Sequence, residues 1–110
     1  MQKISLVALA RQQADRAAGT TAGHAAGTVY GGHEKVLRQT VIALRQGARL
    51  AEHENPGEAT VHVLHGRVRM SAGAESWEGR TGDLLIVPDA RHDLEALEDS
   101  AVLLTVAKLP

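Results

Sequence analysis

The sequence predicts an all-β protein, a sandwich or barrel of short strands, preceded by one short helix. From Val36 onward, apolar and polar residues alternate with a period of two, the pattern of strands with one buried face. Turn signals such as Asn55-Pro56-Gly57 and Gly82-Asp83 separate these segments at intervals of about 8–12 residues, which is typical of sandwiches and barrels. No helical pattern alternates with the strands, which argues against a parallel α/β sheet. A chain of 110 residues is long enough for one hydrophobic core.

The helix is predicted over residues 5–18, where a short apolar stripe repeats at helical spacing. Ser5 can cap its first turn, and Gly19 ends it. The Gly-, Ala- and Thr-rich segment that follows has no periodicity and indicates a flexible connection. We therefore expect residues 1–35 to form an N-terminal helix with a flexible connection, and residues 36–110 to form the β-barrel domain.

Eight strands are predicted, and two of them are apolar on both faces. The strands cover residues 36–44, 49–53, 59–65, 67–72, 75–78, 84–87, 91–97 and 101–107. A strand that faced water on one side would alternate, so strands 84–87 and 101–107 are expected to be covered on both sides. The helix can cover one apolar patch. A second subunit is the expected cover for the other, which predicts a homodimer.

Composition excludes several classes of function. The net charge is −1 with no run of Lys and Arg, so the chain has no electrostatic footprint for nucleic acid or an anionic membrane. No stretch approaches the roughly 20 apolar residues of a membrane span, and the first residues lack the apolar core of a signal peptide, so a cytoplasmic protein is expected. The absence of cysteine excludes disulfides, thiolate metal sites and a cysteine nucleophile.

Histidines on two separate predicted strands are the candidate functional residues. Residues 52–66 (EHENPGEATVHVLHG) hold three of the six histidines around one Pro-Gly turn. Because side chains alternate along a strand, His53 and Asn55 share a face with Ala51, and His92 lies on the less charged face of its own strand. Both histidines are therefore expected to point into the barrel. An imidazole there needs a hydrogen-bond partner or a metal.

Two motif frames in the chain resemble those of the cupin superfamily. In the first, Gly47 is followed by five residues and His53, and Gly66 closes the motif. In the second, Gly82 is followed by five residues and Pro88, with His92 shortly after. The resemblance covers residues 36–107 and is closest to small single-domain, RmlC-like cupins of bacteria. It implies a double-stranded β-helix, or jelly-roll, barrel whose pocket lies at one mouth.

The metal motif of the family is degenerate in this chain. The position of its second histidine holds Asn55, the position of its glutamate holds Ala59, and the glycine after the proline is Ala90. Glu58 is adjacent to the missing glutamate, but strand alternation directs it to the other face unless a β-bulge intervenes.

A candidate metal set of His53, Asn55 and His92 remains, for which Mn, Fe, Ni or Zn is the expected ion. Two imidazoles and one amide make a weak site, because a catalytic metal is normally held by three or four strong protein ligands. Two alternatives stay open. The histidines can hydrogen-bond to each other, to Asn55 or to a bound ligand, or His53 can lie on an exposed loop.

Two further residues complete the candidate ligand-binding set of His53, Asn55, His92, Arg49 and His33. Arg49 has the parity of His53 and would present a guanidinium to an anion if it pointed inward, although an outward arginine is the commoner case. His33 precedes the first predicted strand and could fold over the mouth.

The predicted function is binding of a small molecule in the barrel mouth, with a degenerate or weak metal site, in a sensor or accessory module. The alternative is a metal-dependent cupin enzyme, dioxygenase- or isomerase-like, using His53, Asn55 and His92. A third hypothesis is a structural dimer that binds no ligand and whose barrel mouth is filled by side chains. The fold does not choose among these functions.

Overall fold

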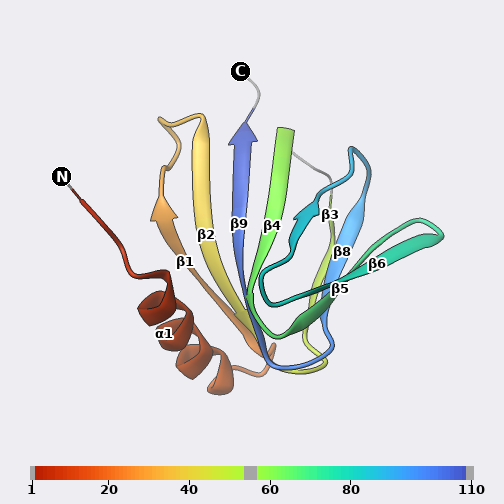
Figure 1. The fold of residues 1–110 in the computed structure, drawn as a ribbon, viewed down its shortest axis with the longest axis horizontal. Coiled ribbons are helices and arrows are strands. Elements are labelled where there is room, and N and C mark those ends of the chain that lie inside the picture. The colour runs from red at the N-terminus through yellow and green to blue at the C-terminus, as the bar shows by residue number, and fades with distance from the viewer. Residues whose placement is uncertain (1, 54–56, 109–110) are drawn as a thin grey trace.

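The computed structural model describes residues 2–53 and 57–108, which form one helix and two facing antiparallel sheets (Figure 1). The five-stranded sheet has the order β1-β2-β9-β4-β7, and the four-stranded sheet has the order β3-β8-β5-β6. The elements are α1 (Leu6–Ala18), β1 (His24–Tyr30), β2 (Leu37–Leu44), β3 (Arg49–His53), β4 (Gly57–His65), β5 (Arg67–Ala72), β6 (Glu75–Arg80), β7 (Leu84–Ile86), β8 (His92–Ala96) and β9 (Ser100–Lys108). All eight predicted strands and the all-β class with one short helix are confirmed.

The core lies between the two sheets, because each strand turns its apolar alternate residues inward. In β4, Ala59, Val61 and Val63 are buried, while the residues between them face outward and stay partly or fully exposed. The face of a sheet toward the other sheet is called inner here, and the opposite face outer. Among the described residues, the largest fully buried side chains are Leu44, Met70, Val41, Val63, Val68 and Val102.

Helix α1 lies on the outer face of the five-stranded sheet, beside β1 and β2 (Figure 1). It begins as predicted, with the Ser5 hydroxyl accepting a hydrogen bond from the Ala8 amide at 3.1 Å. Its contact with the sheet is a small cluster of Ala17, Ala25 and Ala43. No helix in the described part of the chain is long and apolar enough to span a bilayer.

The expected flexible connection is wrong for residues 24–30, which form strand β1. This strand pairs with β2 along most of its length, from His24 opposite Leu44 to Tyr30 opposite Gln39. Its small residues let α1 pack closely, since a Cβ at Gly27 would lie 2.6 Å from Gln13 Nε2. The Gly and Ala content that resembled a linker is therefore what the helix–sheet contact requires.

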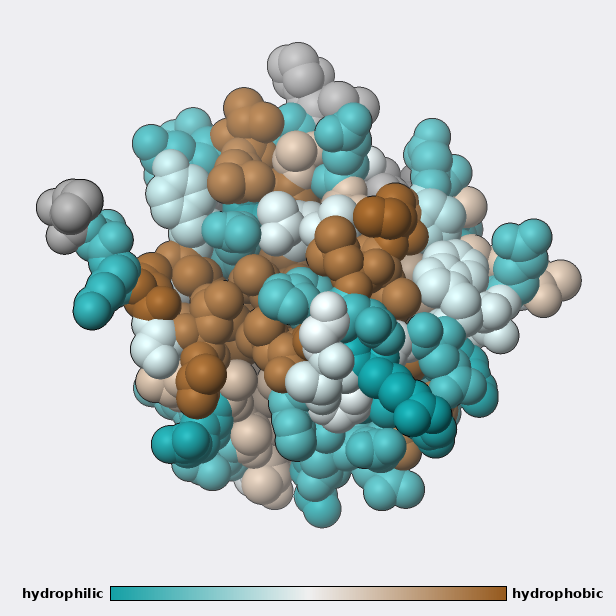
Figure 2. Space-filling view, viewed as in Figure 1, coloured by the Kyte–Doolittle hydropathy of each residue, from teal (hydrophilic) through white to brown (hydrophobic). Residues whose placement is uncertain are grey.

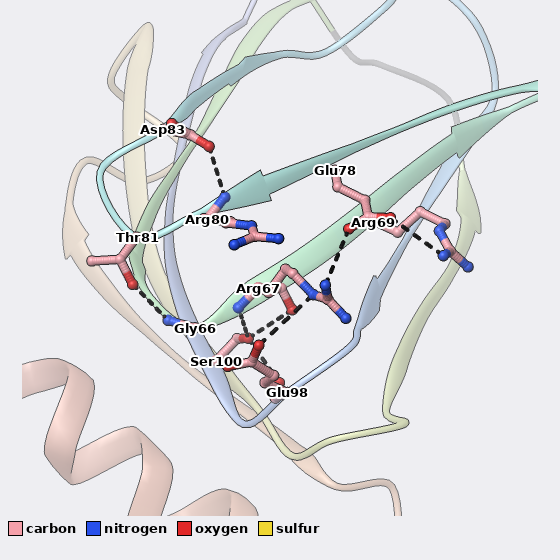
Figure 3. A network of polar contacts seen from close by, with 9 residues as sticks. All are labelled: Gly66, Arg67, Arg69, Glu78, Arg80, Thr81, Asp83, Glu98 and Ser100. Atoms are coloured by element: carbon pink, nitrogen blue, oxygen red, sulfur yellow. Dashed lines mark hydrogen bonds and ion pairs between the residues drawn. The ribbon is translucent and has the colours of Figure 1, made fainter.

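The two outer faces differ in character. The four-stranded sheet carries a row of alternating charges in which Arg67 and Arg69 both pair with Glu78, at 3.7 and 3.5 Å (Figure 3). No ion pair between described residues involves β4 or β7 of the other sheet. On β7, Leu84 and Ile86 are instead 57% and 65% exposed. Figure 2 shows hydrophobic side chains gathered over α1 and the strands next to it, and again over β7.

Candidate functional site at the barrel mouth

The two histidines of the motif frames occupy directly opposite register positions on neighbouring strands. In the antiparallel pair of β3 and β8, the Cα partner of His53 is His92. Opposite residues in such a pair occupy the same face of the sheet. The structure therefore brings together two positions that are 39 residues apart in the sequence (92 − 53).

A β-bulge in β3 decides which residues share the face of His53. Leu50 pairs with Leu94 and His53 with His92, so three residues of β3 span two residues of β8. Leu50 packs against the core, which places Arg49 on the outer face. The inward orientation considered for Arg49 is therefore wrong. Its side chain is 58% exposed and lies 3.7 Å from Asp93 and 3.9 Å from Glu95.

His92 is a buried imidazole with a defined hydrogen bond. It is 5% exposed, and its Nδ1 lies 2.9 Å from the carbonyl oxygen of Ala90. Because a carbonyl can only accept, this contact assigns the proton to Nδ1. In the neutral ring Nε2 is then the acceptor nitrogen.

The position of the missing carboxylate lies inside the barrel. Ala59 is buried in the main core, and its carbonyl accepts a hydrogen bond from the amide of Val87, just before the segment that leads to His92. β4 has no register shift between Gly57 and Val63, so Glu58 faces outward and is exposed. Glu58 therefore does not replace the absent carboxylate.

Two of the three candidate metal ligands lie outside what the structure describes. Asn55 is not among the described residues, and only the backbone of His53 is described. Among the side chains of residues 2–52 and 57–108, no group of three or more His, Asp or Glu is arranged to hold a metal ion. His92 is therefore the candidate ligand whose side chain the structure describes.

Two polar contacts lie at the end of the barrel where His53 and His92 are paired. Arg91 Nε donates to Glu52 Oε1 at 2.9 Å, which ties β3 to the segment before β8. His33 is exposed in the turn between β1 and β2. That turn belongs to the same end of the sheet, because Lys108 pairs with Gly57 at the start of β4 and its Nζ donates to the Gly32 carbonyl at 2.8 Å.

A cavity of about 610 Å³ lies elsewhere, between α1 and the five-stranded sheet. Sequence patterns did not point to it, because its walls come from helix and strand residues that only the tertiary structure brings together. The one local signal was the number of alanines on α1, which leave room between the helix and the sheet.

Comparison with solved structures assigns this architecture to a known fold. A conserved protein of unknown function from Streptococcus pyogenes superposes with a TM-score of 0.73 at 26% identity, over 83% of this chain and 79% of that one. A cupin superfamily protein from Desulfitobacterium hafniense has a TM-score of 0.71 at 14% identity, over 78% of each chain. Salicylate 1,2-dioxygenase from Pseudoaminobacter salicylatoxidans has a TM-score of 0.77 at 19% identity, over 94% of this chain and 34% of that one.

No family model and no curated protein matches the sequence. The structural likenesses nevertheless agree with the cupin-like fold that the two motif frames predicted. The fold is therefore that of the small cupin proteins.

Proposed function

We propose that this cupin domain binds a small molecule in the mouth of its barrel, as a sensor or accessory module, with a metal site that is degenerate or weak. The observation that carries the proposal is His92. His92 is a buried imidazole whose Nδ1 lies 2.9 Å from the Ala90 carbonyl oxygen, and the neighbouring strand places His53 at the opposite register position. This pair of positions supports specific polar recognition in an otherwise aliphatic interior.

The missing carboxylate favours ligand binding over metal catalysis. Ala59 supplies a methyl group at the position where the family motif supplies an anionic ligand. Without that charge, a divalent ion would rest on neutral donors, which hold Mn, Fe, Ni or Zn weakly. A small organic molecule needs a few convergent polar groups on an apolar wall, and the site offers that chemistry.

Elemental analysis and native mass spectrometry test the proposal together. The chain would be purified without chelator or affinity metal, in parallel with His53→Ala, His92→Ala and the control His62→Ala on the outer face of β4. We expect metal far below one ion per chain in every sample. We also expect a bound small molecule in the wild type and in His62→Ala, and none in His92→Ala.

A metal-dependent enzyme, dioxygenase- or isomerase-like, is the second candidate. The register pair of His53 and His92 favours it, because two imidazoles from neighbouring strands are a common part of a metal site. Metal near one ion per chain in the wild type, lost in His53→Ala and His92→Ala and kept in His62→Ala, would establish this alternative and overturn the proposal.

We further propose that a second copy of the chain covers the outer face of β7. Leu84 and Ile86 expose two large aliphatic side chains on a strand at the edge of the five-stranded sheet. The outer face of the four-stranded sheet carries paired charges instead, which suits contact with water. In a two-fold contact the same patch of both copies meets, so the patch must complement itself. An uncharged aliphatic patch meets this condition, because it brings no like charges together.

A further inference from the structure

The cavity between α1 and the five-stranded sheet has the size of a ligand site. Its volume of about 610 Å³ falls within the roughly 300–1,000 Å³ of small-molecule pockets. It lies toward the end of the barrel opposite His53 and His92, where β2 and β4 finish and β9 begins. In Figure 2 this part of the surface is predominantly hydrophobic.

Small side chains on α1 keep the cavity open. Ala10, Ala14 and Ala17 face it from the helix, below Leu6 and Val7 at the first turns. The sheet side is also aliphatic and is formed by Ala43, Leu44, Leu64 and Ala101. Val7 is 68% exposed, so a large apolar side chain on this wall remains in contact with water. An apolar molecule in the cavity would remove that surface from water.

Two arginines stand at the cavity without a carboxylate partner. Arg11 of α1 and Arg45 after β2 both line it, both are exposed, and neither forms an ion pair with a described residue. Asp99 is the carboxylate among the lining residues, and its Oδ1 accepts a hydrogen bond from the Gln46 amide at 2.7 Å. The fixed charges of the lining therefore sum to +1 (two arginines and one aspartate).

We propose that this cavity binds an amphipathic monocarboxylate, a molecule with a linear or ring-shaped apolar body and one carboxyl group. The apolar body lies against the alanines of α1 and the aliphatic floor of the sheet. The carboxylate lies between Arg11 and Arg45, which offer the fork-shaped donors that match it. This site is separate from the barrel mouth and does not depend on the function proposed there.

Charge complementarity selects this occupant over a second copy of the chain. An apolar segment of a partner would leave both guanidinium groups without an anion, whereas a carboxylate neutralises the excess charge of the lining. A neutral lipid or an alcohol would fill the apolar volume and gain nothing from the arginines. The comparison of an acid with its alcohol therefore isolates the proposed interaction.

Decanoate and decanol are the two probes, and binding is measured by titration of the 15N-labelled full chain in heteronuclear NMR. Decanoate is expected to shift the amides of Ala10, Ala14 and Ala101 more than those around His92. The double variant Arg11→Gln/Arg45→Gln should weaken decanoate binding about tenfold, because hydrogen bonds to a charged group are lost at two partly solvated positions. Decanol binding should change by less than about twofold.

Two further variants control for folding and for location. Arg80→Gln removes an exposed arginine on β6 and should leave decanoate affinity unchanged. Ala14→Leu narrows the cavity from an exposed helix position and should weaken both probes while helix content is kept, because leucine is a good helix former. Equal binding of the two probes by the wild type, decanoate shifts confined to the mouth, or unchanged affinity in the double arginine variant would each overturn the proposal.

Discussion

Gly66, which closes the first motif, sits in a backbone conformation that requires glycine. Its φ is +95°, in the region that side chains disfavour. A Cβ there would lie 2.5 Å from the carbonyl oxygen of Asp99 and closer still to the Ser100 hydroxyl. That hydroxyl is occupied, since it accepts from the Arg67 amide at 3.0 Å and lies 2.8 Å from the Glu98 carbonyl oxygen (Figure 3). The motif glycine thus lies at the end of the barrel opposite His53 and His92, where β4 ends and β9 begins.

Replacing Gly66 with alanine should destabilise the chain more than the same change at Gly73. Gly73 also has a positive φ, of +59°, but a Cβ there meets nothing within 4 Å. Gly73→Ala should therefore cost only the backbone penalty, about 1–2 kcal/mol of unfolding free energy. Gly66→Ala should cost that amount plus the clash with Ser100 and Asp99. Urea denaturation measures both values, and equal losses would contradict the role of the contact.

Ala59→Glu should restore the missing metal ligand. The position is buried on the inner face, so without metal the new carboxylate should lower the unfolding free energy by about 1–3 kcal/mol. Added Ni²⁺ or Zn²⁺ should raise the melting temperature of this variant more than that of the wild type, because a ligand that binds only the folded state stabilises it.

Thr60→Glu is the matched control for Ala59→Glu, since Thr60 is the next residue of β4 and faces outward. It should show no gain from metal in thermal melting. An equal gain in both variants would mean that the ion binds outside the barrel, and no gain in either would mean that Ala59 does not lie within reach of the histidine positions.

At the scale of the elements, helix α1 is held by few buried side chains. Only Gln13 and Ala17 are buried along its length, and its packing cluster consists of alanines. Strand β9, in contrast, lies between β2 and β4 and pairs with both. A cavity beside the helix removes further contacts from that side. The helix is therefore an element that can open without the barrel unfolding.

Hydrogen–deuterium exchange should show faster exchange of the α1 amides than of the β9 amides. Local opening exposes the helix amides at a free energy below that of global unfolding, while the central strand exchanges only when the barrel unfolds. If decanoate occupies the cavity, it should slow exchange in α1 and leave β9 unchanged. Equal protection of α1 and β9 in the absence of ligand would contradict the weak attachment.

At the scale of the whole molecule, the apolar edge at β7 predicts self-association. Multi-angle light scattering of the wild type should give the mass of a dimer, and Leu84→Glu/Ile86→Glu should give that of a monomer, because two carboxylates on each copy would repel across a two-fold contact. Val36→Glu is the matched control, since Val36 is 65% exposed like Ile86 but precedes β2. A monomeric wild type, or dissociation by Val36→Glu, would contradict the prediction.

Much of the fold was predictable because its signals are local. The period-two alternation located strands such as β4, and a serine and a glycine marked the ends of α1. The burial of His92 followed from its parity with Leu94. β1 was missed because its pairing with β2 is non-local and its small residues carry no period. Arg49 was included among the candidate ligand-binding residues because strict alternation gives it the parity of His53, and the bulge between Leu50 and His53 leaves no mark in the sequence.

By itself, the sequence determined the strand pattern, the cupin-like frame around His53 and His92, and the replacement of the motif glutamate by Ala59. The tertiary structure decided the face of Arg49, the register that sets His53 against His92, and the cavity that Arg11 and Arg45 both line. The physical reason is the range of the forces involved. Alternation and capping act between near neighbours in the chain, whereas bulges, cavities and paired strands arise from packing between segments far apart in it.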